Sequence, residues 1–228
     1  MRYVFSVLLF LLIFFSWNYA TEAISYGTIE LSVTSSANAG AEQGATTAVF
    51  LYYNNYLVEK FQSSRLSKNG SGYVDSVFCF IDPQKKYCTE YDEMSKTAKE
   101  ITSYPLENKT YGYLFPHDSV TRPENYLRAV NMPDTAIDFY TYKRFYIITK
   151  TRDSVTYYIS PSKLPIPFHL NRVVDADYKG TLIRIDALKL GSKLPDVTSL
   201  RMQVYPNRMY SNELGVLGTW IARATGKK

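Results

Sequence analysis

Apolar and polar residues alternate at every second position through much of the chain after residue 24, which is the period of a β-strand with one buried face. The first such segment carries Ile29, Leu31 and Val33, separated by polar residues. Similar segments follow in the last third of the chain, one of them around Phe168. The candidate core comprises Ile29, Leu31, Val33, Val155, Tyr157, Ile159, Ile166, Phe168, Leu170, Ile183 and Ile185.

Short turn signals separate these segments, such as Asn54-Asn55 and Arg152-Asp153. Strands joined by short turns pair with their neighbours in sequence, so the pattern predicts a mostly β fold with a single antiparallel sheet of about nine or ten strands. One short helix is predicted over 92–104, where Met94, Ala98 and Ile101 fall on one helical face.

The N-terminus has the pattern of an export signal. Arg2 precedes an apolar run over 4–15, and small residues follow at Ala20 and Ala23. The run is shorter than the roughly 20 apolar residues of a membrane-spanning helix. The sequence therefore predicts a signal peptide over 1–23, a single mature domain over 24–228, and export to the periplasm or beyond the cell. A retained N-terminal anchor is the alternative.

Charge and composition narrow the classes of partner. The chain has a formal net charge of +5, and its charges are interspersed apart from the terminal Lys227-Lys228. A nucleic-acid-binding protein shows a basic stripe or a recognisable motif, and this sequence has neither, so no nucleic-acid partner is predicted. The 21 tyrosines favour strands, and they could also supply a binding surface. Nothing in the sequence indicates an oligomeric state.

The two cysteines flank a predicted hairpin turn. Asp82-Pro83-Gln84-Lys85 suits a type I turn, and with Pro83 and Gln84 as the loop residues Cys79 faces Cys88. That spacing makes the two a non-hydrogen-bonded pair, in which side chains approach closely. An oxidising compartment then favours a Cys79–Cys88 disulfide, with two free thiols as the alternative.

Candidate catalytic chemistry is sparse. His117 adjoins an aspartate, but no serine or cysteine nucleophile motif accompanies it, and 70–72 lacks the spacing of a nucleophile elbow. His169 lies among core positions and is expected to face solvent. The sequence therefore predicts a protein that is not an enzyme and has no cofactor or metal.

Three segments of the last third follow a recurring rhythm: 146–161 is strand, turn and strand, 164–167 is proline-flanked, and 180–185 opens a further strand. This rhythm resembles secreted bacterial envelope proteins of unknown function related to the GLPGLI-motif family, within the lipoprotein-carrier-like (LolA-like) half-barrel group. The resemblance implies a curved, open sheet with a concave apolar face. The residues expected to form a ligand-binding surface on that face are Tyr157, Phe168, Leu170, Ile183 and Ile185.

Two functions are compatible with these features. The favoured one is a non-enzymatic envelope protein that binds a lipid or lipoprotein acyl chain on the concave face, with the 92–104 helix as a plug or lid. The alternative is an interaction module whose Tyr-rich surface binds another envelope protein or a glycan.

A further pattern, aspartate followed by serine or threonine and then an aliphatic residue, resembles the O-glycosylation signal of one group of Gram-negative bacteria. Aspartate before serine or threonine also starts strands after turns, so the alternative is structural. The candidate acceptors are Ser76, Ser119, Thr135 and Ser154.

Overall fold

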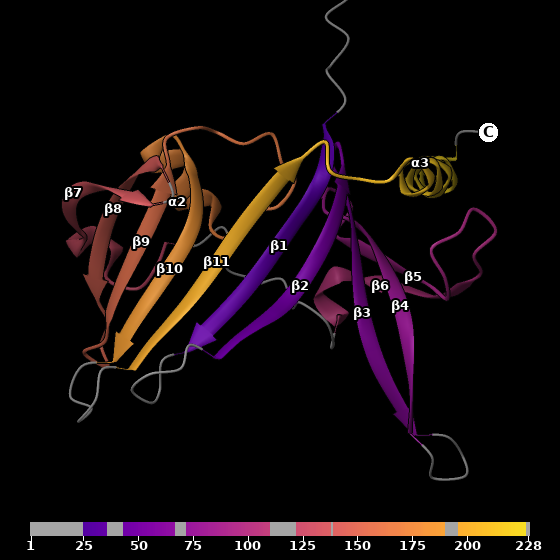
Figure 1. Cartoon of the computed structure of the whole chain (residues 1–228), viewed down its shortest axis with the longest axis horizontal. Helices are drawn as coiled ribbons and strands as arrows, with labels where there is room; N and C mark the ends of the chain where they lie inside the picture. Colours follow the sequence, from indigo (N-terminus) through magenta and orange to yellow (C-terminus); the bar gives the residue numbers. More distant parts are fainter. Residues whose placement is uncertain are drawn as a thin grey trace, which may run out of the picture.

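The computed structural model describes residues 25–35, 43–66, 72–109, 122–137, 139–189 and 196–226, with side chains described from 48 to 60 and from 77 to 109 in the second and third ranges. They form one antiparallel sheet of 11 strands (Figure 1). The strands are β1 Tyr26–Ser35, β2 Gln43–Tyr53, β3 Tyr56–Leu66, β4 Gly72–Asp82, β5 Tyr87–Tyr91, β6 Glu100–Pro105, β7 Val130–Ile137, β8 Tyr140–Ile148, β9 Ser154–Ser160, β10 Thr181–Lys189 and β11 Asp196–Pro206. The predicted mostly β fold with one antiparallel sheet is confirmed, and the predicted signal peptide lies outside the described residues.

The strand order is β6-β5-β4-β3-β2-β1-β11-β10-β9-β8-β7. Each half of the chain is thus a run of neighbouring antiparallel strands, and the halves join where the first strand pairs with the last. Ile29 lies opposite Val204, and Leu31 lies opposite Met202. Because β6 and β7 lie at opposite edges of this order, the curved sheet stays open.

The two faces of the sheet carry separate hydrophobic clusters. The larger covers the inner, concave face and joins strands from both halves, from Cys79 on β4 to Phe145 on β8. The smaller lies on the outer face and includes Val58, Phe80 and Tyr91. Of the predicted core, all but four residues are buried; the four that are only half-buried are Val33, Val155, Ile183 and Ile185.

Helix α3, Ser211–Thr225, covers the outer cluster. Trp220 is fully buried, stacks on Tyr91 with ring centroids 4.1 Å apart, and donates from Nε1 to the Ser95 carbonyl at 3.1 Å. Glu213 accepts the Tyr210 backbone N–H at 2.9 Å, which satisfies a donor at the start of the helix. The alternation of the sequence predicted neither this helix nor β11.

The predicted helix over 92–104 is wrong. Residues 92–99 form a bent loop, closed where the Asp92 carboxylate accepts the Lys99 backbone N–H at 3.0 Å, and β6 then pairs with β5. Side-chain capping of this kind competes with helix formation. Met94 and Ala98 do find an apolar partner, but it is the outer cluster beneath α3. The segment is therefore neither a plug nor a lid of the concave face.

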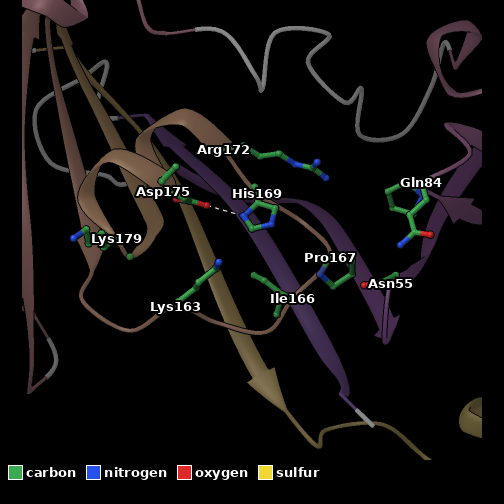
Figure 2. Close-up of a pocket in the computed structure, with 12 residues that line it drawn as sticks. Asn55, Gln84, Lys163, Ile166, Pro167, His169, Arg172, Asp175 and Lys179 are labelled. Carbon is green, nitrogen blue, oxygen red and sulfur yellow. Dashed lines mark hydrogen bonds and ion pairs between the residues drawn. The ribbon is translucent and has the colours of Figure 1, made fainter. Parts of the chain in front are cut away.

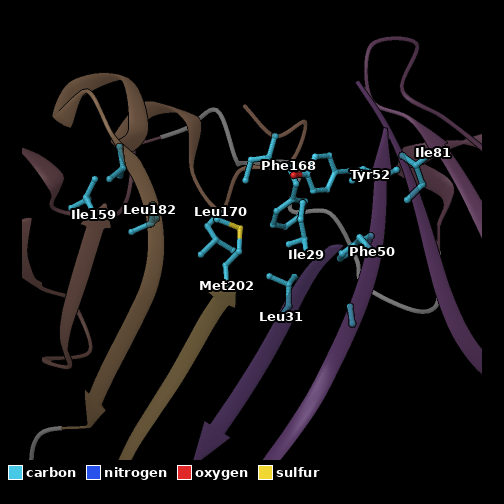
Figure 3. Close-up of a cluster of buried hydrophobic side chains, with 14 of the residues drawn as sticks. Ile29, Leu31, Phe50, Tyr52, Ile81, Ile159, Phe168, Leu170, Leu182 and Met202 are labelled. Atoms are coloured by element: carbon cyan, nitrogen blue, oxygen red, sulfur yellow. The ribbon is translucent and has the colours of Figure 1, made fainter. Parts of the chain in front are cut away.

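A different segment, residues 161–171, covers the upper concave face. Residues 161–171 were expected to include a strand through Ile166, Phe168 and Leu170, yet they form no strand and cross the upper concave face (Figure 3). The prolines at 165 and 167 lack the N–H groups that a sheet ladder needs. Phe168 stacks on Phe50 of β2, with ring centroids 5.5 Å apart. The alternation was thus produced by a loop that buries every second side chain.

After this crossing segment, the short helix α2 spans Arg172–Tyr178. The Asn171 side chain begins it by accepting the backbone N–H groups of Val173 and Val174, both at 3.0 Å. Two 3-10 turns complete the described elements, η1 over Leu106–Asn108 and η2 over Tyr126–Arg128.

The predicted pairing of the cysteines is also wrong. The Asp82 carboxylate accepts the Gln84 and Lys85 backbone N–H groups, both at 3.0 Å, and the loop spans four residues, 83–86. This longer loop shifts the register, so Cys79 lies opposite Glu90 and Cys88 lies opposite Ile81. The cysteines are diagonal neighbours on the concave face, and both are free, buried thiols.

We therefore expect alkylation of the native protein to be slow at both cysteines. The thiols are fully buried, and the hydrogen bond to Cys88, with desolvation, raises the pKa of Cys79, which suppresses the reactive thiolate. Intact-mass measurement after alkylation should show both thiols modified in denaturant without reductant, and neither without denaturant. Modification that requires a reductant would contradict this expectation.

Candidate functional site

A continuous apolar row crosses the middle of the concave face. Val33 pairs with Leu200, Leu200 with Ile185, and Ile185 with Tyr157. Directly opposite residues of antiparallel strands have Cβ atoms about 4.5–5.5 Å apart. Each residue of the row is therefore in contact with the next one across β1, β11, β10 and β9. The aliphatic members keep exposed surface, whereas Tyr157 is buried.

The half-buried aliphatic side chains of this region are here called the concave strip. Ala187 extends it along β10, and Val155, which pairs with Ala187, extends it along β9. The strip consists of Val33, Val155, Ile185, Ala187 and Leu200.

Aromatic rings close one end of the row. Phe145 of β8 lies opposite Tyr157 and stacks on it with ring centroids 4.7 Å apart. Tyr178 of α2 stacks on Phe145 at 4.8 Å, and its hydroxyl donates to Asn131 Oδ1 at 2.8 Å. Burial raises the pKa of Tyr157 to about 12, so its hydroxyl stays neutral near neutral pH. Tyr126 adds an edge-on contact to Phe145, and the row ends in a fixed aromatic wall.

The upper end of the concave face is closed by the crossing segment, residues 161–171. Phe168 and Leu170 lie above Ile29, Leu31 and Met202 (Figure 3), and both are buried. Of the five residues expected to bind a ligand, the structure therefore places Phe168, Leu170 and Tyr157 within the core.

The remaining two, Ile183 and Ile185, are half-buried against the core on β10. The register shifts between Leu182 and Arg184, and Leu182 is fully buried. Such a bulge is invisible in the alternation, which is why Leu182 was missed as a core residue.

Polar groups are also buried on the concave face, in the half of the sheet that the N-terminal strands form. Lys109 Nζ lies 2.6 Å from Glu59 Oε2, and both side chains are almost fully buried. Nearby, the Tyr104 hydroxyl donates to Glu90 Oε1. A lone glutamate in a strand carries no signal of burial, so sequence reasoning missed these residues. A buried ion pair is weak evidence for function, because it depends on fixed partners and desolvation.

A groove of about 690 Å³ lies at the upper end of the sheet (Figure 2). Its histidine, His169, is held through Nδ1 by the Asp175 carboxylate at 2.7 Å, and the other oxygen of Asp175 accepts the Leu182 backbone N–H at 2.6 Å. His169 is thus half-buried and oriented, and does not simply face solvent as expected. The described residues that line the groove include no serine, threonine or cysteine that this pair could activate.

A second groove, of about 380 Å³, contains residues of the outer face. It includes Tyr140 and Tyr205, with Arg184 and Arg201. Arg184 lies over the Tyr158 ring at 5.0 Å and pairs with Asp186 at 2.7 Å. Tyrosine and arginine side chains therefore lie together in this concavity.

Other predicted features fall in scattered places. Ser119 and His117 lie outside the described residues, and Ser76 lies in β4 with its side chain undescribed. Thr135 lies in the edge strand β7, and Ser154 starts β9. O-glycosylation at these acceptors stays a prediction.

Within the described ranges, no three His, Cys, Asp or Glu side chains gather in a way that could hold a metal ion. None of the helices in those ranges combines the length and apolar character needed to cross a membrane.

Comparison with known proteins identifies no family for this chain and finds a similar solved structure. No family model matches the chain, and no curated protein matches it. Among solved structures, the chain is similar to the LolA superfamily protein NE2245 from Nitrosomonas europaea, at 10% sequence identity over 82% of this chain and 86% of that chain. The TM-score of this match is 0.23, and nothing about the function of this chain follows from it.

Proposed function

We propose that this chain is an exported, non-enzymatic binding protein that holds the acyl chain of a lipid or lipoprotein along the concave strip. The observation that carries the proposal is the strip itself: aliphatic side chains from four adjacent strands meet on one concave surface and stay half-exposed. Contiguous exposed apolar surface on a soluble fold is typical of a binding site.

The shape of the strip suits a linear apolar ligand. It crosses β1, β11, β10 and β9, so at about 4.8 Å between strands it is roughly 14 Å long. Each methylene group buried there contributes about 0.8 kcal/mol of favourable transfer free energy. The side chains of the strip carry no polar atom, so they offer no acid, base or nucleophile. This supports binding in preference to catalysis.

A charge placed in the strip should abolish binding. Ile185→Glu puts a carboxylate beside the ligand, where it must either lose hydration while charged or take up a proton, and both are unfavourable. We expect the affinity for a fluorescent fatty acid to fall about tenfold or more, and co-purifying lipid to be lost in native mass spectrometry. The variant should remain folded, because residue 185 keeps exposed surface.

Ile148→Glu is the matched control. On β8, Ile147 is buried in the concave core, so the next residue points to the outer face, where Ile148 is 42% exposed. This control should bind the fatty acid as the unmodified protein does. Equal loss in both variants, or no loss in either, would contradict the proposal.

A second candidate function, recognition of a glycan or of another envelope protein, is favoured by the outer groove. Tyr140 is 68% exposed and lies there beside Arg184 and Arg201. Aromatic faces next to hydrogen-bond donors suit such ligands. Tyr140→Ala would weaken glycan or protein binding and leave fatty-acid binding unchanged. Ile185→Glu would weaken fatty-acid binding and leave glycan or protein binding unchanged.

A further inference from the structure

The groove at the upper end of the sheet is strongly cationic. Lys163, Arg172 and Lys179 line it, and Asp175 is its one lining carboxylate among the described residues. Three positive charges and one negative charge give a net charge of +2 with His169 neutral. Lining charges of one sign raise the local concentration of oppositely charged ligands.

The lysines and the arginine are available to a ligand. None of the three forms an ion pair with a described carboxylate, and all three are exposed. Asp175 is engaged by His169 and by the Leu182 backbone N–H, so it does not neutralise them by direct contact. The positive charge of the groove is thus uncompensated within the described part of the chain.

His169 makes the groove an organised site. Its Nδ1 is fixed on Asp175, which is only 8% exposed, and this contact leaves Nε2 as the ring nitrogen for a ligand. Figure 2 shows His169 with Lys163 and Arg172 on either side of it. A histidine held in this way keeps its ring in one orientation beside the cations and loses little conformational freedom when a ligand binds.

The opposite wall comes from a distant part of the chain. Asn55 lies in the β2–β3 turn and Gln84 in the β4–β5 turn, and both line the groove with polar amides. Ile166 and Pro167 of the crossing segment add apolar surface. The volume of about 690 Å³ is within the range of small-molecule sites, and it exceeds the needs of a simple inorganic ion.

We propose that this groove binds a phosphate group, carried by a lipid headgroup or by a soluble phosphate compound. A phosphate carries a charge of about −1.5 to −2 and three acceptor oxygens, so it can engage several cations at once. The Arg172 guanidinium provides the planar fork that suits phosphate oxygens, and the lysines act as point charges. Anion binding here and acyl binding on the concave strip use different residues, so each can fail without the other.

The test uses the double variant Lys163→Gln/Arg172→Gln, with Lys99→Gln/Arg128→Gln as a control of equal charge outside the groove. Lys99 and Arg128 are both exposed. One arm titrates inorganic pyrophosphate by calorimetry at low ionic strength, where screening is weak. The other measures flotation with phosphatidylglycerol vesicles, compared with phosphatidylcholine vesicles. Circular dichroism verifies that every variant is folded.

We expect the unmodified protein to bind in at least one arm, with affinity lowered about tenfold or more by the groove variant and unchanged in the control variant. Pyrophosphate binding without vesicle binding would indicate a soluble phosphate compound, and selective vesicle binding alone would indicate a lipid headgroup. Absence of binding in both arms, or equal loss in the groove and control variants, would overturn the proposal.

Discussion

Phe168→Ala is expected to lower the free energy of unfolding by about 3–5 kcal/mol, as large-to-small changes of a buried aromatic residue do. Phe168 is 2% exposed and stacks on Phe50 in the concave core. Because the crossing segment closes the upper end of that face with this ring, its removal leaves a cavity between two layers of the fold. The surrounding strands are held by their ladders, so the cavity cannot fully collapse.

Urea denaturation followed by circular dichroism gives this change directly. Phe168→Leu should lose less, because the branched side chain refills part of the volume. Phe139→Ala is the matched control: Phe139 is fully exposed, and its removal should change stability by about 0.5 kcal/mol or less. A loss for Phe168→Ala no larger than for Phe139→Ala would show that the ring does not seal the core.

Trp220→Ala should lower the free energy of unfolding by a similar amount, about 3–5 kcal/mol. It should also release α3 from the outer face. The indole is fully buried, stacks on Tyr91, and donates its N–H to the Ser95 carbonyl. It also meets Phe80 edge-on, with ring centroids 6.3 Å apart. Arg223 of the same helix also holds the 92–99 loop, since its guanidinium donates to the Ala98 carbonyl at 3.2 Å and to the Lys96 carbonyl, but of these two side chains the indole is the fully buried one.

The release of α3 has its own measurement. Hydrogen exchange of the α3 amides should become fast in Trp220→Ala, while that of β1 and β11 at the centre of the sheet stays slow. Trp220→Phe should retain much of the stability, since it keeps a stacked aromatic ring and loses the donated hydrogen bond and only part of the buried indole volume. Asn212→Ala changes an exposed position of the same helix and should leave exchange unaltered. Fast exchange in β1 together with α3 would mean that the helix is part of the central cooperative unit.

The sequence was most informative where structure is local. The alternation around Ile29 and Leu31 located β1, and Asn54 does turn the chain between β2 and β3 with a positive φ of 51°. Asparagine tolerates this left-handed conformation, so its turn signal is physical. By contrast, the pairing of β1 with β11 joins residues far apart in the chain, and no short-range pattern contains it.

The errors have specific causes. One aspartate side chain, Asp82, lengthened the hairpin loop and moved both cysteines out of register. Burial of every second residue in a loop imitated a strand around Phe168. In α3 the signal was present, since Val216, Leu217 and Trp220 have helical spacing and Gly226 follows the helix with φ 66°.

The candidate site was only partly accessible to such reasoning. Ile185 does lie on the concave face, and its role in ligand binding stays a prediction. Which residues of that face keep exposed surface depends on the crossing segment above them. The cationic groove depends on turns that come together from separate halves of the chain. Only the tertiary arrangement contains that information.

The central claim is that an acyl chain lies along the concave strip, and nuclear Overhauser contacts test it most directly. With methyl-labelled protein and dodecanoate, contacts from the ligand methylenes should reach Val33, Ile185 and Leu200, and none should reach Ile148 on the outer face. Saturable dodecanoate binding with contacts confined to other residues, or the absence of any binding, would contradict the account.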